Sequence, residues 1–93
     1  MLSQNSTNFM NRVIKLAKDN LNNNKIPIAA IVVDSLSNEI ISEAVNGDSV
    51  LDHAEILALN KALDKLSTNR LTMHDIYVSI EPCPMCATAI AKT

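Results

Sequence analysis

The sequence predicts an α/β fold in which helices cover both faces of a mixed sheet. Helical and strand-like segments follow one another in the order α, β, β, α, β, α, and this alternation is typical of a sheet between helices. The first strand-like segment is a continuous, largely β-branched apolar run, which indicates a strand covered on both faces. With 93 residues, 47% of them hydrophobic and 19% charged, the chain has the length and composition of one globular domain, residues 1–93.

Three segments predict helices. Residues 8–21 and 53–66 carry apolar side chains at helical spacing, with charged side chains between them. In the first segment the apolar side comprises Phe9, Met10, Val13, Ile14, Ala17 and Leu21. In the second it comprises Ala54, Leu57, Ala58, Ala62, Leu63 and Leu66. We expect a third helix to begin at Pro82, because proline favours the first helical turn.

Three further segments predict strands. Residues 26–33 form the continuous apolar run, with Pro27 among its first residues, where a missing N–H is tolerated. Turn-forming residues 34–38 join it to a second strand over residues 39–45, so we expect a hairpin. Residues 76–80 predict a short third strand.

Composition excludes several classes of function. The single glycine, Gly47, excludes the glycine-rich loops that bind nucleotide phosphates. The formal net charge of -2 gives no general attraction to nucleic acid. No apolar run is long enough to span a membrane, and residues 1–6 do not resemble a signal peptide. We therefore expect a cytoplasmic protein with no membrane partner.

Two short motifs carry side chains suited to metal chemistry. His53 opens one predicted helix, and Cys83 and Cys86 lie in the first turn of another. Catalytic zinc sites use three nitrogen or sulfur ligands and keep the fourth position for water, which is the number that this chain offers. A Cys-x-x-Cys pair in a reducing compartment can instead be a redox pair, and that alternative stays open.

Glu55 and Asn46 are the other candidate site residues. Glu55 follows His53 by two positions, so its carboxylate could move a proton to and from water beside the metal. Alternatively, Asp52 and Glu55 fit a helix capping box. Asn46 precedes Gly47 and taken alone is a turn residue, and His74 is interpreted as a loop residue outside the site. Both metal motifs open a helix that follows a strand, and ligands bind at such strand ends in open sheets.

These residues resemble the cytidine deaminase superfamily, and most closely its bacterial tRNA-specific adenosine deaminase branch. The resemblance extends from Val13 to about Ala91. It rests on Ile-Pro-Ile-Ala-Ala over residues 26–30, His-Ala-Glu over 53–55, and Glu-Pro-Cys-Pro-Met-Cys over 81–86. His-x-Glu followed by Pro-Cys-x-x-Cys is the signature of the zinc nucleobase deaminases.

The resemblance implies a three-layer α/β/α fold with one Zn²⁺ per protomer, held by His53, Cys83 and Cys86. Glu55 is then the proton shuttle, and Asn46 hydrogen-bonds a flipped base. The implied reaction is adenosine to inosine at the wobble position of a tRNA anticodon loop: water attacks C6, Glu55 protonates the ring nitrogen, and ammonia leaves. A homodimer is also implied.

Members of that family continue past the third helix with two further strands and C-terminal helices. By this resemblance we expect the C-terminal strands and helices to be missing here, which leaves the third strand as an exposed edge and the chain weak or inactive in tRNA deamination. Two alternatives stay open. One is deamination of a free base or nucleoside such as guanine or cytosine, and the other is a non-enzymatic zinc-binding remnant.

Overall fold

The computed structural model describes residues 4–47, 53–68, 71–79 and 84–93. Its helices are α1 (Gln4–Asn22), α2 (Ala54–Leu66) and α3 (Pro84–Lys92). Its strands are β1 (Ala29–Asp34), β2 (Ile40–Val45) and β3 (His74–Val78). The predicted order of elements is therefore confirmed.

The three strands form one sheet in the order β2-β1-β3, and β1 is antiparallel to both neighbours. β1 and β2 form the predicted hairpin, with a bulge between Val32 and Val33. Because β2 and β3 both oppose β1, they run parallel to each other on its two sides. The chain therefore leaves β2 and β3 at the same end of the sheet, and each exit leads toward a helix that carries a predicted motif.

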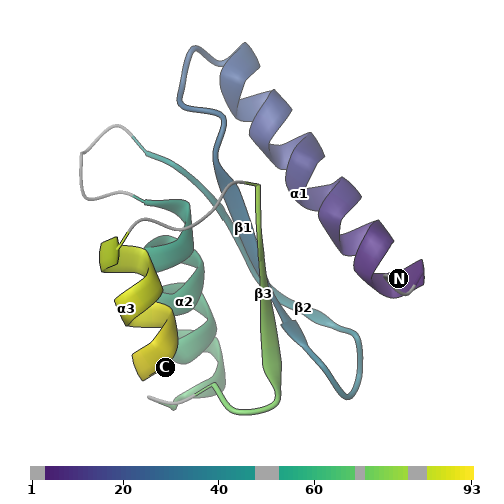
Figure 1. Ribbon diagram of the computed structural model, residues 1–93, viewed down its shortest axis with the longest axis vertical. Helices are drawn as coiled ribbons and strands as arrows, with labels where there is room; N and C mark the ends of the chain where they lie inside the picture. Colours follow the sequence, from purple (N-terminus) through teal and green to yellow (C-terminus); the bar gives the residue numbers. More distant parts are fainter. Residues whose placement is uncertain (1–3, 48–52, 69–70, 80–83) are drawn as a thin grey trace.

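The molecule has three layers, as Figure 1 shows: α1 covers one face of the sheet, and α2 with α3 covers the other. Residues 29–33 of β1 are buried, and they alternate between the two cores. Ala29, Ile31 and Val33 pack with Val13 and Ala17 of α1. On the opposite face the buried core contains Ala30, Val32, Ile41, Ala44, Ala54, Ala58, Leu59 and Ala62. The predicted three-layer α/β/α class is confirmed.

The buried side of α1 differs from the predicted one. Val13 and Ala17 are buried, but Ile14 and Leu21 are 41% and 55% exposed. Successive helical residues turn by about 100°, so the buried stripe runs through Val13, Ala17 and Asn20 and turns Ile14 and Leu21 outward. Because Asn20 is polar, the spacing of apolar residues alone does not identify this buried side of the helix.

Several predicted boundaries shift. β1 begins two residues after Pro27, because this proline has no N–H to donate to the sheet. β3 begins at His74, so His74 is a strand residue and its interpretation as a loop residue is wrong. α3 begins at Pro84, while Pro82 lies outside the described residues. No described helix has the length and apolar character needed to cross a membrane.

Candidate functional site

The start of α2 determines how His53 and Glu55 are placed. His53 is the N-cap residue, with extended backbone angles of φ -73° and ψ 134° and no side-chain capping bond. Ala54 is therefore the first helical residue and Glu55 the second. A capping box requires the acidic residue at the third helical position, so that interpretation of Asp52 and Glu55 is wrong. Asp52 itself lies outside the described residues.

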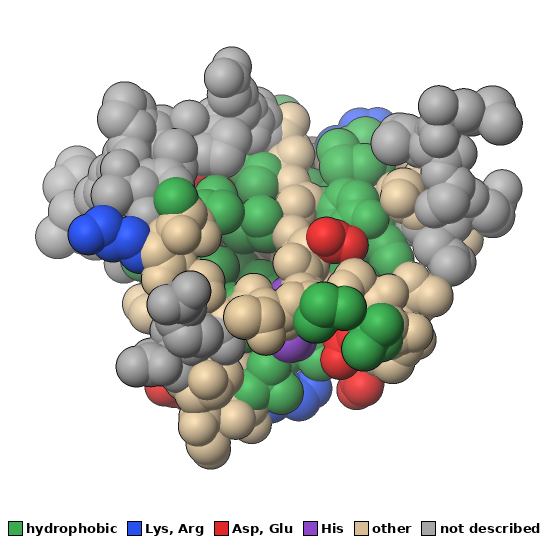
Figure 2. All heavy atoms as spheres, turned by 60° about the horizontal axis from the view of Figure 1, so that its bottom comes forward, with side chains coloured by type: hydrophobic (Ala, Val, Ile, Leu, Met, Phe, Trp, Pro, Cys, Tyr) green, Lys and Arg blue, Asp and Glu red, His purple; other side chains and the backbone are tan. Residues whose placement is uncertain are grey.

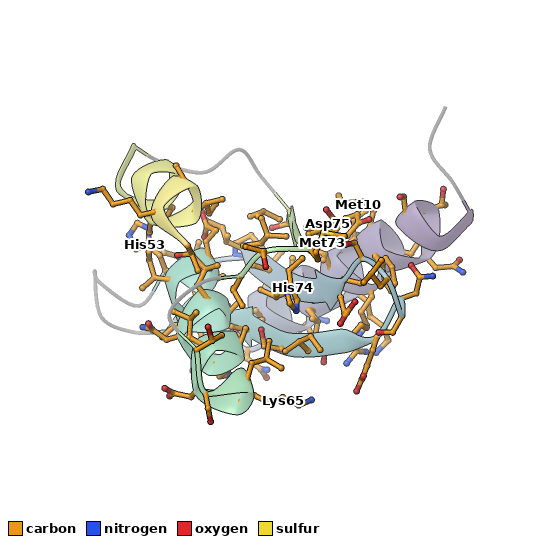
Figure 3. All side chains as sticks on the ribbon, turned by 90° about the horizontal axis from the view of Figure 1, so that it is seen from below. Met10, His53, Lys65, Met73, His74 and Asp75 are labelled. Carbon is orange, nitrogen blue, oxygen red and sulfur yellow. The ribbon has the colours of Figure 1, made fainter. Side chains whose placement is uncertain are left out.

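His53 and Cys86 meet where α2 contacts α3. The Nδ1 atom of His53 lies 3.4 Å from the Sγ atom of Cys86, although 33 residues separate them in sequence. Cys86 is the third residue of α3 and is completely buried. Figure 3 shows His53 beside α3, at the beginning of α2. The packing of α2 against α3 thus brings together two of the three predicted zinc ligands.

The separation of these two atoms suits a shared zinc ion. With Zn–N near 2.05 Å and Zn–S near 2.3 Å, tetrahedral coordination places nitrogen and sulfur about 3.5 Å apart. The observed 3.4 Å agrees with that spacing. Cys83, the third predicted ligand, lies outside the described residues, and the described ranges contain no cluster of three metal-binding side chains. The donors present therefore fit zinc in type and spacing.

Glu55 is a carboxylate on the buried side of α2. It is 3% exposed and lies on the same side of the helix as Ala58, Leu59 and Ala62. Within the described part of the chain, no group donates a hydrogen bond to its carboxylate. Burying a carboxylate costs free energy unless a partner stabilises it. The carboxylate therefore faces inward within the first turn of α2.

Asn46 connects the end of the hairpin to the beginning of α2. Its Oδ1 accepts a hydrogen bond from the backbone N–H of Ala54 at 2.7 Å, and its backbone N–H donates to the carbonyl of Ile28 at 3.0 Å. Asn46 is 8% exposed. Its side chain therefore satisfies a helix-start N–H that has no partner within the helix. The predicted contact of Asn46 with a base stays a prediction.

Asn20 also supports this region, and the sequence pattern did not predict this role. Its Nδ2 donates to the carbonyl of Ile26 at 2.6 Å and to the carbonyl of Asn46 at 3.1 Å, and the residue is 5% exposed. One side chain of α1 thereby binds both the segment that precedes β1 and the segment that follows β2. The sequence feature that could have identified Asn20 is its position three residues after Ala17, which places it on the buried stripe of α1.

His74 is separate from the site. It pairs with Asp34 in the β1–β3 register, and its Nδ1 lies 2.6 Å from the carbonyl oxygen of Thr72. Figure 3 shows it over the sheet, away from His53. Leaving His74 out of the ligand set therefore agrees with its place in the fold.

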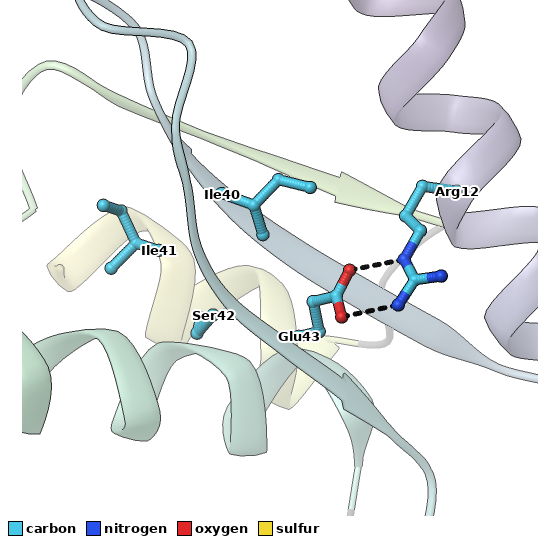
Figure 4. Close-up of a pocket in the computed structure, with 5 residues that line it drawn as sticks. All are labelled: Arg12, Ile40, Ile41, Ser42 and Glu43. Atoms are coloured by element: carbon cyan, nitrogen blue, oxygen red, sulfur yellow. Dashed lines mark hydrogen bonds and ion pairs between the residues drawn. The ribbon is translucent and has the colours of Figure 1, made fainter.

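An open pocket of about 570 Å³ lies along β2 and is lined by Arg12, Ile40, Ile41, Ser42 and Glu43 (Figure 4). Arg12 Nε and Nη2 donate to the two Glu43 carboxylate oxygens at 2.6 and 2.9 Å. This hydrogen-bonded ion pair holds the pKa of Glu43 below its ordinary value. None of the predicted site residues lines the pocket, and the paired charges tie α1 to β2.

Comparisons with known proteins agree on one family. Residues 3–93 match the family model described as the cytidine and deoxycytidylate deaminase zinc-binding region. The chain is 41% identical over 88 residues to the tRNA-specific adenosine deaminase of Rickettsia bellii, a match that covers 90% of this chain. The same match covers 61% of that relative, so the chain spans about three fifths of its length.

Solved structures show the same likeness. One comes from a study of A-to-I editing by tRNA:A34 deaminases at the wobble position of transfer RNA. It superimposes with a TM-score of 0.84 at 33% identity and covers 92% of this chain and 68% of its own. A guanine deaminase from Bacillus subtilis gives a TM-score of 0.86 at 32% identity, covering 97% of this chain and 58% of its own.

Proposed function

Because the chain belongs to the cytidine and deoxycytidylate deaminase zinc-binding family, we propose that it catalyses zinc-dependent hydrolytic deamination and that its substrate is the wobble adenosine of a tRNA anticodon loop. The observation that carries the chemistry is the 3.4 Å approach of His53 Nδ1 to Cys86 Sγ, with the buried Glu55 two residues after His53. The likeness to tRNA-specific adenosine deaminases supports the choice of substrate.

We assign zinc to His53, Cys83 and Cys86. When bound, the ion supplies the Lewis acidity that makes water a nucleophile at neutral pH. The chain contributes a histidine nitrogen at the start of α2 and a buried sulfur in the first turn of α3. Both come from helix starts, where unpaired N–H groups favour negative charge on a thiolate ligand.

We assign the proton transfers to Glu55. Hydrolytic deamination adds water to C6 of adenosine, places a proton on the ring nitrogen and releases the amino group as ammonia. A carboxylate that accepts the water proton and then donates it completes both transfers. Glu55 suits this role because it is 3% exposed and accepts no hydrogen bond from the described residues.

Asn46 is assigned to the base. Its Oδ1 is bonded to the Ala54 N–H, which fixes the plane of the side-chain amide. The Nδ2 group, which donates to none of the described residues, can then donate to an acceptor on the flipped base. Asn20 positions this group indirectly through the Asn46 carbonyl.

Guanine is the second candidate substrate, because the chain superimposes on a guanine deaminase as well as on a tRNA deaminase structure. On the face shown in Figure 2, the described Lys and Arg side chains lie apart and do not form one basic patch. RNA binding depends on contacts from basic side chains to phosphates. The substrate must therefore be decided by comparing the two candidates in parallel assays.

The test is a deamination assay with the zinc-loaded chain. One arm uses an anticodon stem-loop with a wobble adenosine and measures inosine, and the other uses free guanine and measures ammonia. In keeping with the weak activity expected of this chain, we expect slow inosine formation in the first arm and no product above background in the second, with Glu55→Gln inactive in both. Product only from guanine would overturn the substrate assignment. No product in either arm would overturn the enzymatic proposal for this chain.

A further inference from the structure

The hydroxyl of Ser79 takes the place of a backbone carbonyl where β3 separates from β1. Ser79 directly follows β3 and lies opposite Ala29, and its N–H donates to the Ala29 carbonyl at 3.0 Å. In a regular antiparallel pair the carbonyl of Ser79 would accept the N–H of Ala29 in return. Here the Oγ of Ser79 accepts that N–H instead, at 3.0 Å. The pair is therefore completed by a side chain, and the backbone can turn away from β1 at this residue.

The N–H of Ala29 requires this acceptor because Ala29 is completely buried. A buried backbone N–H without an acceptor costs free energy. A chain that lacked the hydroxyl could turn the carbonyl of residue 79 toward β1, but this would lengthen β3 by one residue and redirect the segment that follows. Residue 79 therefore decides where the pairing of β3 with β1 ends.

The peptide group between Ile28 and Ala29 also holds the other exit from the sheet. The Ile28 carbonyl accepts the N–H of Asn46, the residue that follows β2, at 3.0 Å. The Ile28 carbonyl and the Ala29 N–H belong to one planar, rigid unit. A single peptide group therefore binds the chain that leaves β2 on one side and the chain that leaves β3 on the other. Both exits lie at the same end of the sheet (Figure 1).

Each exit leads to a proposed zinc ligand. His53 lies seven residues after Asn46, and Cys86 lies seven residues after Ser79. The Nδ1 atom of His53 and the Sγ atom of Cys86 are 3.4 Å apart. We propose that Ser79 is a positioning residue for the zinc site, because its hydroxyl fixes where the segment with the cysteine ligands leaves β1. The proposal rests on the assignment of zinc to His53, Cys83 and Cys86, and it adds a residue outside that ligand set.

The test compares Ser79→Val with Ser79→Thr, two side chains of nearly the same shape that differ in a methyl group and a hydroxyl. Groups that hold metal ligands in place change metal affinity by about 10–100-fold when they are substituted, so Ser79→Val should bind zinc at least 10-fold more weakly than wild type. Ser79→Thr keeps the acceptor oxygen and should bind zinc with wild-type affinity. Competition with a chromophoric chelator measures both affinities. Loaded with Co²⁺, wild type and Ser79→Thr should share one absorption spectrum, which Ser79→Val should change.

Ser42→Ala separates positioning from a general loss of stability. The hydroxyl of Ser42 donates to the carbonyl of Ala58 at 2.7 Å, and Ser42 is buried, so this variant also loses a buried hydrogen bond. It should unfold at a lower urea concentration than wild type but keep the zinc affinity and the Co²⁺ spectrum. Folded Ser79→Val with wild-type affinity and spectrum would overturn the proposal, and so would an equal loss of affinity in Ser42→Ala.

These measurements detect metal binding, so a failure of the deamination assay does not affect them. A wild-type chain that shows no thiolate-to-Co²⁺ charge-transfer band would overturn the zinc assignment, and the role of Ser79 with it. A wild-type chain that binds the metal while Ser79→Val binds it equally well overturns the role of Ser79 alone.

Hydrogen exchange in the wild-type chain gives a second measurement that does not depend on the folding of a variant. The amide of Ala29 should be protected to the same extent as the amide of Ile31, which pairs with Tyr77 within the regular part of the sheet. Removal of zinc with a chelator should leave the two amides equally protected, because the bond to Ser79 belongs to the sheet. Faster exchange at Ala29 than at Ile31 after zinc removal would show that the metal positions Ser79, and would overturn the proposal.

Discussion

The side chain of Asn46 caps the helix that carries the proposed catalytic carboxylate. Its Oδ1 accepts the backbone N–H of Ala54 at 2.7 Å, so a residue that follows β2 fixes the first turn of α2. Asn20 in turn donates to the carbonyl of Asn46 at 3.1 Å. The end of the hairpin, the start of α2 and the last turn of α1 are therefore one hydrogen-bonded unit beneath the site.

Substitutions at Asn46 separate its two roles. Asn46→Ala leaves the Ala54 N–H without its acceptor and should lower the free energy of unfolding by about 1–2 kcal/mol. Asn46→Asp keeps an acceptor oxygen at the positive end of the helix and should stay near wild-type stability. It lacks the Nδ2 donor, however, so substrate binding should weaken. Urea unfolding and KM measurements check this, and equal destabilisation by both variants would contradict it.

Glu55→Gln should abolish proton transfer while the fold persists. General acid–base groups contribute about 10²–10⁴-fold to rate, so kcat should fall by at least 100-fold. Zinc content should stay at wild-type level, because the proposed ligands are untouched. The control is Glu39→Gln at an exposed position, which should not change kcat. Inosine formation by Glu55→Gln at the wild-type rate would exclude the catalytic role.

Substitutions of the two histidines provide a test of metal binding and its matched control. His53→Gln should reduce zinc from one ion per chain to well below it after dialysis, because a catalytic zinc has only three protein ligands. His74→Gln should retain full zinc, since His74 belongs to β3 and lies away from His53. Elemental analysis of both purified variants checks the assignment. Zinc loss in His74→Gln alone would reverse it.

Asn20→Ala should destabilise the chain by about 1–3 kcal/mol, because it leaves two carbonyls without their side-chain donor. Asn22→Ala, two residues later and exposed, should change the free energy of unfolding by no more than about 0.5 kcal/mol. Thermal or urea unfolding compares them. Similar values for the two variants would show that the Asn20 bonds are not important for stability.

Glu43 should make stability depend on acid pH. Its hydrogen bonds to Arg12 lower its pKa in the folded chain from the ordinary value of 4.5. The ion pair therefore contributes stability at neutral pH, and this contribution is lost as the pH falls below about 4.5 through the folded pKa. Glu43→Gln should cost about 0.2–1 kcal/mol at pH 7, since the pair is partly exposed. Unfolding curves at pH 7 and pH 3 should show this difference vanishing in acid.

Local patterns predicted the elements well, because each helix and strand has its own periodicity. They misplaced Ile14 and Leu21 on the buried side of α1, since a polar residue, Asn20, occupies that stripe. They also left a capping role open for Glu55 beside the catalytic one, because spacing alone cannot say whether Asp52 or His53 is the residue that caps the helix. The backbone of His53 settles this: it is extended and precedes the first helical residue.

The sequence by itself determined the three-layer class, the family resemblance and the identity of the candidate ligands, because these depend on residue types and short spacings. Only the tertiary structure decided that His53 and Cys86 meet at 3.4 Å, that Glu55 faces inward, and that Asn46 caps α2. These are contacts between segments far apart in the chain. They arise because β2 and β3 leave the sheet at the same end, on opposite sides of β1, and no local pattern contains that pairing.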